Sequence, residues 1–483
     1  MNPENYFFIL PDKLQDKCSL FVFKHFFILW YFRKLRFIKL DYTKMEELPL
    51  KIRHFKDVDA VVSHTWHDVS EKSLEKRAFS LLFLDEYLDK KPKHPSLVSS
   101  AEGKIKKILF TIPYYIIEGD DNPHWAVYSE LFQKLPEHTE IIILAQNGCH
   151  AFLNAWMLEK KMGKQVRLIE FPDYINFTIW AEDAYAIVKD AVSNKSYFIE
   201  PHSFPRWEDG FIADFVAKDL KWGRTQIPLY FEGGNILVGD DFFLIGADHP
   251  IISLKYISSM VISKKGESKS KLITRLYKKY LDRTRKIIYV GCTLPVPSSK
   301  ESDFEYKGER WKQYYYRKNE GGTVQPIFHI DMFLTLAGRS ENGKYRILVG
   351  DPKLASELIN LPVLSYAMTE LFDNIANNLI KAGFEVIRNP LPLIYFDDEK
   401  EKLRTWYFAT SNNALVEIIN YEIKTVWLPT YGYGNWKELK KTDDYNKKIW
   451  KDLGFKVISL GDFHPFIENS GSLHCIKKYL ERA

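Results

Sequence analysis

From Ile105 onward the sequence repeats one pattern, in which an apolar, strand-like run leads to an amphipathic helix and then to a second strand-like run. The first copy reads KILFTIPYY, PHWAVYSELFQKL and TEIIILAQ. A later copy reads YRILVGD, LSYAMTELFDNIANNLIKAG and FEVIRNP, and the last reads VWLPTYG, DYNKKIWKDLG and FKVISLG. About five such units fit into this part of the chain, which predicts an α/β fold built from degenerate repeats.

The residues before this repeat lack the pattern. We expect residues 1–104 to form an N-terminal extension, partly helical, and residues 105–483 to form the α/β domain. In the extension, Ser70–Lys91 has helical spacing, and KPKHPSLVSSAEG reads as a linker. The apolar run Leu20–Phe32 is too short to span a bilayer, so a packed segment is favoured over a membrane-associated one. Whether Met45 is the true start of the protein stays open.

Charge and cysteine content exclude several classes of function. The net charge of +5 is too mild for this length to indicate nucleic-acid binding. The four cysteines are far apart and form no C-x-x-C pair: Cys18, Cys149, Cys292 and Cys475. A disulfide framework and a cysteine-rich zinc site are therefore not expected. We expect the protein to work in a reducing compartment, the cytoplasm.

Polar residues interrupt the apolar runs at a similar stage of each unit. The interruptions are WAEDA, FEGGN, FHIDMF, TSNNAL and SLHC. Charged residues inside strand-like runs are costly unless they pair or bind something. If the units surround a common axis, these five segments meet at its centre.

Each segment also has a plainer interpretation. Glu232 with its two glycines fits a hairpin turn, and the acids of WAEDA fit a solvent-facing strand end. On a strand, His329 and Asp331 would point to one face, as a structural pair or as half of a metal site. No third ligand cluster with metal spacing is visible, so no metal is expected. The basic stretch Lys269–Lys286 fits a solvated helix face better than a phosphate or partner site.

Two cysteines compete as a nucleophile. Cys149 opens a predicted helix, and a helix N-terminus lowers a thiol pKa. Its neighbour His150 is poorly placed as a base, because adjacent residues on a helix diverge. Cys475 is the other candidate, and His474 beside it is disfavoured as its base because neighbours on a strand face opposite ways.

The ordered set Asp183, Glu232, His329 with Asp331, and Cys475 resembles the guanidine-modifying superfamily, the pentein fold. Its members include agmatine, arginine and bacterial-type peptidylarginine deiminases, dimethylargininases and amidinotransferases. FEGGN is similar to the family's E-G-G-[DN], HIDMF to H-[ILV]-D, SGSLHCI to G-x-x-H-C, and WAEDA to its W-x-R-D region. The resemblance covers the chain from the first repeat onward, and implies a five-bladed α/β propeller with the site on its central axis.

The resemblance also implies roles for the residues. A thiolate at Cys475 attacks the guanidinium carbon, and His329 protonates the leaving amine and then activates water. Asp183 and Asp331 hold the guanidinium, with Glu232 close to the substrate and to the histidine.

Further contacts and alternatives follow from the same resemblance. Asn412, in the run SNNALVEIIN, and Trp180 are expected to bind substrate, which is a small guanidine or an arginyl side chain. No cofactor and no metal are expected, and the oligomeric state is open, with a homodimer as one option. An amidinotransferase using the same thiouronium intermediate, or a non-catalytic binding protein on this scaffold, is the alternative to a hydrolytic deiminase.

The sequence departs from the family pattern in two places. Glu182 stands where many relatives carry arginine before the aspartate, and the residues after Cys475 read IKKYLERA instead of a polar tail. Both departures concern the substrate more than the reaction.

Overall fold

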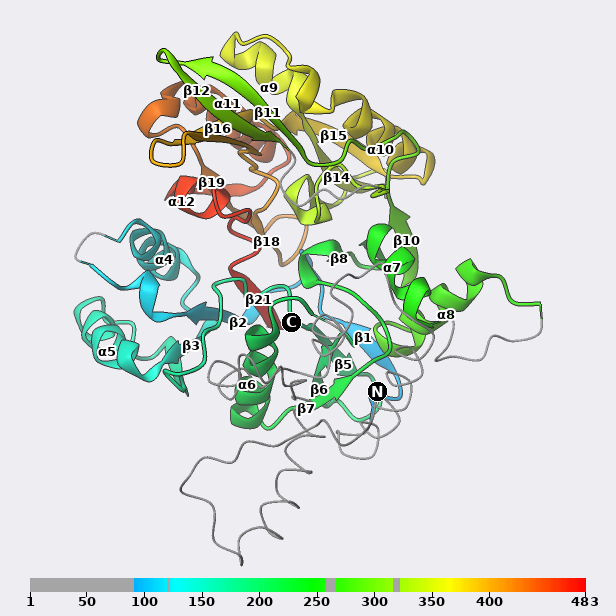
Figure 1. Ribbon diagram of the computed structural model, residues 1–483. Coiled ribbons are helices and arrows are strands. Elements are labelled where there is room, and N and C mark those ends of the chain that lie inside the picture. Colours follow the sequence, from blue (N-terminus) through cyan, green and yellow to red (C-terminus); the bar gives the residue numbers. More distant parts are fainter. Residues whose placement is uncertain (1–90, 120–121, 203, 258–265, 316–321) are drawn as a thin grey trace, which may run out of the picture.

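The computed structural model describes residues 91–119, 122–202, 204–257, 266–315 and 322–483 (Figure 1). The apolar run Leu20–Phe32, Cys18, Met45 and all but the last residue of the helix expected over Ser70–Lys91 lie outside the described residues. No helix in the described part of the chain is long and apolar enough to cross a membrane.

Five of the six sheets formed by the described residues share one pairing order. In each, a first strand runs antiparallel to a second, and the second runs parallel to a third. Helices connect the second strand to the third, as a parallel pair requires. The repeat predicted from the sequence is therefore present in the pairing of the strands.

The bounds of these five sheets, each in spatial order and with its helices, are as follows. The first holds β21 (Lys477–Arg482), β2 (Ile105–Ile112), β3 (Glu140–Gln146) and β4 (Val166–Phe171), with α4 (Pro123–Lys134) and α5 (His150–Glu159). The second holds β1 (Pro95–Leu97), β5 (Ala186–Asp190), β6 (Ser196–Glu200) and β7 (Gly223–Gln226), with α6 (Ile212–Leu220). The third holds β8 (Ile236–Val238), β9 (Phe242–Gly246) and β10 (Lys286–Val290), with α7 (Asp248–Ile257) and α8 (Lys269–Tyr280). The fourth holds β13 (Leu334–Arg339), β14 (Tyr345–Asp351) and β15 (Glu385–Pro390), with α9 (Pro352–Ile359) and α10 (Thr369–Lys381). The fifth holds β18 (Leu415–Ile418), β19 (Lys424–Thr430) and β20 (Lys456–Asp462), with α11 (Lys440–Asp452).

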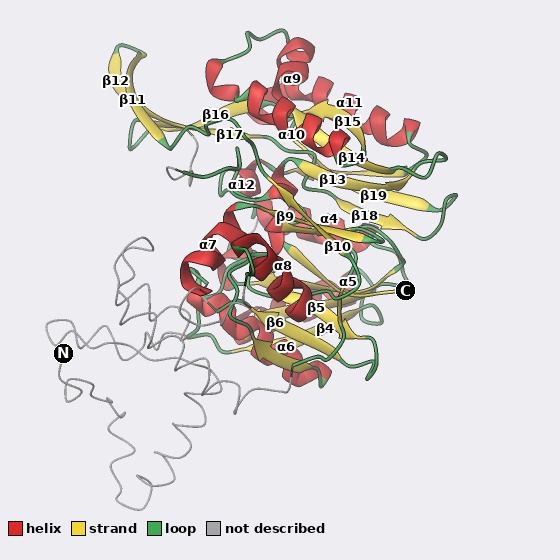
Figure 2. Ribbon diagram, turned by 90° about the vertical axis from the view of Figure 1, so that its right-hand side faces the viewer, coloured by secondary structure: helices red, strands yellow, loops and turns green. Residues whose placement is uncertain are grey.

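A sixth sheet is formed by segments inserted around the fourth unit. Its strands are β11 (Lys300–Tyr306), β12 (Glu309–Tyr315), β17 (Leu403–Phe408) and β16 (Leu393–Asp398). The β11–β12 hairpin projects from the body of the molecule (Figure 2).

Short helices fill the connections. They are η4 (Tyr114–Ile116), η5 (Asn147–Cys149), η6 (Trp207–Phe211), η7 (Gly233–Asn235), η8 (Ile330–Met332), η9 (Ser365–Ala367), η10 (Gly434–Leu439) and α12 (His464–Ile467).

Local sequence signals explain where the repeat helices begin. The Asn122 side chain accepts hydrogen bonds at the start of α4, and Pro123 occupies the first helical position. Asp351 and Pro352 do the same for α9. Helix α8 buries its apolar face and exposes several lysines, so the basic stretch predicted as a solvated helix face forms one. The segment expected to be a linker contains β1, which pairs with β5.

The two ends of the repeat region meet in the first sheet. Strand β21 pairs antiparallel with β2 (Figure 1). In this pairing Lys477 lies opposite Phe110. The turn just before β21 carries Cys475, and the pairing fixes that turn against the first unit.

Candidate functional site

The five polar segments converge because they hold the same position in the five similar sheets. Asp183, Glu232, Asp331, Asn413 and Cys475 lie two to four residues before β5, β8, β13, β18 and β21, the first strand of each pairing pattern. They therefore stand in turns and 3₁₀ helices next to strand ends, and the expectation that they interrupt strands is wrong. The expectation that they occupy one stage of each unit is confirmed.

Gly234 is the point on which His329, Asp331 and Asp183 converge. A Cβ built on this glycine would lie 2.6 Å from His329 Nδ1, 3.1 Å from Asp331 Oδ2 and 3.2 Å from Asp183 Oδ1. A Cβ on Gly233 would lie 1.8 Å from the Glu182 carbonyl oxygen. Close approach of side chains and backbone, and not a hairpin turn, therefore requires the double glycine after Glu232.

His329 is held between two carboxylates. Its Nε2 lies 2.7 Å from Glu232 Oε2, and its Nδ1 lies 3.7 Å from Asp183 Oδ1. Burial opposes charge on the ring, but Asp183 and Glu232 together raise the pKa of His329 above its ordinary value. The hydrogen bond and charge of His329 overcome burial and hold the pKa of Glu232 well below the usual range. The two shifts together favour an ionised Glu232 carboxylate beside a protonated His329 ring.

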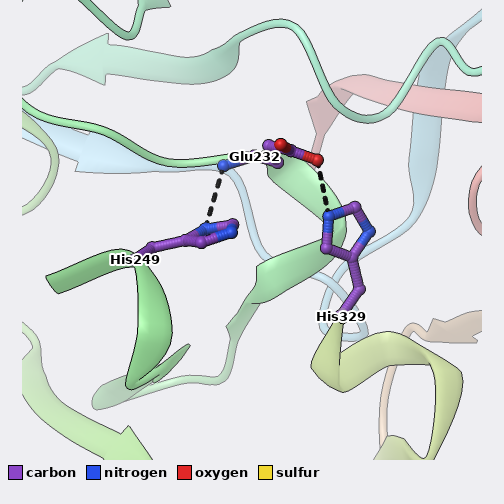
Figure 3. A group of neighbouring side chains, drawn as sticks. All are labelled: Glu232, His249 and His329. Carbon is purple, nitrogen blue, oxygen red and sulfur yellow. Dashed lines mark hydrogen bonds and ion pairs between the residues drawn. The ribbon is translucent and has the colours of Figure 1, made fainter. Parts of the chain in front are cut away.

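Glu232, His249 and His329 also form a group whose possible metal-ligand atoms all lie within 4.8 Å of one another (Figure 3). The backbone N–H of Glu232 donates to His249 Nδ1 at 3.2 Å, and burial lowers the pKa of His249 to about 3. His249 is therefore neutral with its proton on Nε2, so neither ring nitrogen offers a free lone pair. The Glu232 carboxylate already accepts from His329. Hydrogen bonding accounts for this group better than a metal does.

Asp331 links the nucleophile candidate to the second histidine. Its Oδ2 lies 2.9 Å from His474 Nδ1 and 3.7 Å from Cys475 Sγ. Burial raises the pKa of Asp331 to about 7, and the charges of Asp183 and Glu182 add to this effect. The charge of His329 acts in the opposite direction and lowers the pKa. Among the described residues, Asp331 Oδ1, His329 Nδ1 and His474 Nε2 are buried atoms without a hydrogen-bond partner. Unpaired buried polar atoms of this kind indicate a place for a polar ligand.

Cys475 is buried among these groups. Asn413 Nδ2 lies 3.3 Å from Cys475 Sγ, and Asn413 Oδ1 accepts the backbone N–H groups of His474 at 2.7 Å and of Cys475 at 3.2 Å. Burial first, and then the charges of Asp331 and Asp183, raise the pKa of the Cys475 thiol well above its ordinary value. Cys475 therefore favours the protonated thiol, and a nearby cation is needed for it to ionise.

Comparison with solved structures shows which known proteins share this fold. C. jejuni agmatine deiminase matches with a TM-score of 0.50 and 17 % identity, over 80 % of this chain and 95 % of that chain. A cysteine-to-serine variant of the C. jejuni enzyme with substrate bound gives 0.51 and 16 %, over 80 % and 96 %. Agmatine deiminase of Enterococcus faecalis gives 0.53 and 12 %, over 82 % and 98 %. This chain has the fold of the agmatine deiminases. The sequence matches no protein-family model and no curated protein sequence.

The resemblance drawn from the motifs is thus confirmed for the fold. Within this agmatine-deiminase fold, Asp183, Glu232, His329, Asp331 and Cys475 come together as the motifs predicted. The prediction that His329 and Asp331 share a strand face is wrong, because His329 caps the 3₁₀ helix η8 and Asp331 lies within it. They converge on one spot by a tight turn.

Two further predicted residues have different surroundings. The Trp180 indole packs on Gly471 so closely that a Cβ there would lie 2.2 Å from the ring, which places Trp180 beside the Cys475 turn. Asn412 exchanges side-chain hydrogen bonds with Asn389, at 2.9 and 3.1 Å. The next residue, Asn413, contacts the sulfur instead.

Cys149 lacks the surroundings of a nucleophile. Its sulfur lies 3.7 Å from the Ile112 carbonyl oxygen, and His150 turns away toward the Ala145 carbonyl. Burial, and then Asp173, raise the pKa of Cys149 to about 11, so the lowering expected from a helix N-terminus does not occur. Cys292 is also buried.

Sequence reasoning missed the groups that support the cluster. Arg206 Nη2 donates to Asp183 Oδ2 at 2.7 Å, and its Nε donates to Asp209 at 2.8 Å. Tyr230 donates to Glu232 at 2.5 Å, beside His249. No motif marks these side chains: Arg206 lies outside the strand-like and helical runs of the repeat, and Tyr230 directly precedes FEGGN without being part of it. His474 was set aside on the assumption of a strand, but it lies in a turn and contacts Asp331.

Proposed function

We propose that the protein is a cysteine-dependent hydrolase that deiminates a guanidinium group. Cys475 Sγ forms a bond to the guanidinium carbon, the C–N bond to the leaving amine breaks, and His329 gives that amine a proton. Water, deprotonated by His329, then attacks the thiouronium carbon and releases a ureido product and the thiolate. Glu232 keeps the histidine protonated for the first step.

Asp331 carries this proposal. Its buried Oδ1 has no hydrogen-bond partner among the described residues, while its Oδ2 lies 3.7 Å from Cys475 Sγ. A guanidinium offers N–H donors and positive charge to that oxygen, with its carbon near the sulfur. The same charge would lower the pKa values of Asp331 and of the thiol, so binding would ionise the nucleophile. The C. jejuni agmatine deiminase holds bound substrate in a variant whose cysteine is replaced by serine, which supports a cysteine in this role.

We also propose an arrangement for the whole chain. We infer that the five similar sheets close around the Cys475 cluster as a five-bladed α/β propeller. We also infer that residues 105–483 form this catalytic domain behind an extension of residues 1–104, whose strand β1 joins the second sheet. The equivalent placement of the functional segments before the first strand of each pattern supports it. The described cysteines are unpaired thiols, which fits work in a reducing compartment such as the cytoplasm.

An apolar pocket beside the cluster suggests what the guanidine carries. The pocket is partly open to solvent, spans about 600 Å³ with its mouth included, and is lined by residues that include Phe328, Met332 and Trp406. The Phe328 ring lies 4.7 Å from that of His329, and Met332 Sδ lies 4.0 Å from Cys475 Sγ. We therefore propose a guanidine with an aliphatic substituent, such as agmatine or an arginyl side chain, with Asp183 and Trp180 completing its contacts.

The test is a substrate panel assayed for ureido product and for released ammonia or amine. Agmatine, arginine, methylated arginines, arginyl peptides and methylguanidine are compared, with Cys475→Ala as the blank. We expect turnover of alkyl guanidines above that of methylguanidine, and no turnover by Cys475→Ala. Absence of ureido product from every compound would refute the proposal, and product that depends on added glycine, ornithine or lysine would indicate amidino transfer instead.

A further inference from the structure

The two places where the sequence departs from the family pattern contact each other. Lys477 Nζ donates to Glu182 Oε2 at 2.7 Å, and Lys478 Nζ donates to Glu182 Oε1 at 2.9 Å. The three side chains are 0 %, 8 % and 8 % exposed for Lys477, Lys478 and Glu182. An acid in place of arginine, and two lysines in place of a polar tail, thus form one buried ionic group.

This group joins the nucleophile turn to the Asp183 turn through backbone contacts as well. The Glu182 N–H donates to the Cys475 carbonyl oxygen at 3.2 Å, and Lys478 Nζ also donates to the Glu182 carbonyl oxygen at 2.9 Å. The Glu182 carbonyl is the atom that approaches Gly233 so closely. Glu182 therefore ties together the segments before β5, β8 and β21.

Charge explains why both lysines are needed. The cluster contains the carboxylates of Glu182, Asp183, Glu232 and Asp331 and the cationic groups of Arg206, His329, Lys477 and Lys478. A buried carboxylate is tolerated only when it is paired, and Glu182 would otherwise add its repulsion to that of Asp183 and Asp331. Burial lowers the pKa of Lys477 to about 8, against the opposing pull of Glu182. Its charge also lowers the pKa of Asp331, after the larger effect of His329.

We propose that Glu182, Lys477 and Lys478 form an ionic clamp that positions Cys475 against Asp183 and Asp331. The clamp residues are positioning residues, since they reach the reacting atoms only through Cys475, Asp183 and Asp331. The lysines are adjacent on β21, and their long side chains both reach one carboxylate while the strand pairs with β2. The predicted fall in kcat rests on the proposed function, whereas the clamp itself is inferred from the contacts alone.

The experiment compares Glu182→Gln, Lys477→Met and their double variant with the wild type in the full-length protein. Lys477→Arg is the conservative replacement. Arg224→Met is the matched control, because Arg224 is equally buried in ion pairs with Glu200 and Asp214 at 2.6 Å, away from the cluster. Steady-state deimination gives kcat and KM, thermal unfolding gives Tm, and peptide mass spectrometry gives the rate at which iodoacetamide alkylates Cys475.

The clamp predicts opposite changes in the two rates. Releasing it misplaces the sulfur, which lowers kcat by about 100-fold with a smaller change in KM. Releasing it also opens the buried turn, which speeds alkylation of Cys475 by about tenfold. Lys477→Arg restores most of both rates, and the double variant loses no more than the worse single variant. Arg224→Met lowers Tm and leaves kcat, KM and alkylation unchanged.

The clamp is refuted if kcat and alkylation both stay at wild-type values while Tm falls, or if the effects of the two single variants multiply. Glu182→Gln, which keeps the shape of the side chain, carries the test if Lys477→Met does not fold. Iodoacetamide is neutral and needs no guanidine site. If the wild type deiminates nothing, the alkylation comparison still decides the clamp, and the failure belongs to the proposed function.

Discussion

Replacing Asp331 by asparagine should stabilise the protein above neutral pH while it removes activity. The pKa of Asp331 is raised from 3.8 to about 7, chiefly by burial. Between those values the folded protein holds a proton that the unfolded chain has lost, so the free energy of unfolding falls as the pH rises through this window. Each pKa unit corresponds to about 1.4 kcal/mol, so the ionised carboxylate costs the folded state at most about 4 kcal/mol above pH 7.

The size of the effect follows from what asparagine keeps. Its amide oxygen can still accept from His474 Nδ1, while the charge that burial opposes is gone. We expect Asp331→Asn to raise the free energy of unfolding by about 1–4 kcal/mol at pH 8, and by less than about 1 kcal/mol at pH 4.5. In the same variant kcat/KM should fall by about 100-fold or more, because the guanidinium loses its carboxylate.

Urea denaturation followed by tryptophan fluorescence at the two pH values measures this difference. Asp452→Asn, which removes an exposed partner of Lys448, is the control and should change neither stability nor activity. The reasoning is refuted if Asp331→Asn destabilises the protein equally at both pH values, since the carboxylate would then not be the strained group. In the wild type, kcat/KM should fall as the pH drops below about 7, because protonated Asp331 no longer attracts the guanidinium.

Three further outcomes follow from the same cluster. Cys475→Ser should abolish turnover while Cys149→Ser changes kcat by less than about twofold, because only Cys475 touches the carboxylates; equal losses would make Cys149 the nucleophile. Glu232→Gln should lower the pKa of His329, so the alkaline limb of kcat moves to lower pH and kcat at pH 8 falls by about 10–100-fold, and an unmoved limb in the pH–rate profile would exclude this pairing. Gly234→Ala should lower kcat/KM by about 100-fold or more, because its Cβ would stand 2.6 Å from His329 Nδ1, and a wild-type kcat/KM in a folded variant would contradict the close approach.

The sequence predicted the repeat and the members of the cluster because both depend on local patterns. An apolar run followed by an amphipathic helix is visible in a window of some 20 residues, and it became the parallel strand pairs of each unit. Asp183, Glu232 and Cys475 stood out because polar groups interrupt apolar runs in a fixed order. Their order along the chain selected them, because it resembles the order of these residue types in the guanidine-modifying superfamily.

What the sequence could not supply was the direction of side chains outside regular elements. The strand rule placed His329 and Asp331 on one face, but a 3₁₀ turn brings them together instead. Asn412 and Asn413 are adjacent and alike in chemistry, and only the turn before β18 decides which of them meets the sulfur. Arg206 is ordinary in its own segment and acquires its role only through a contact with Asp183.

Strand β2 shares its sheet with a strand that lies far along the chain. Phe110 pairs with Lys477, so one edge of β2 has to wait for β21 while the ribosome adds more than 360 residues. Contacts of such long sequence separation form late, and an unpaired strand edge is prone to join other chains in the meantime. Nascent protein should therefore depend on holding chaperones during synthesis. Because the same late pairing delivers Cys475, the proposed nucleophile reaches its carboxylates only once that edge is closed.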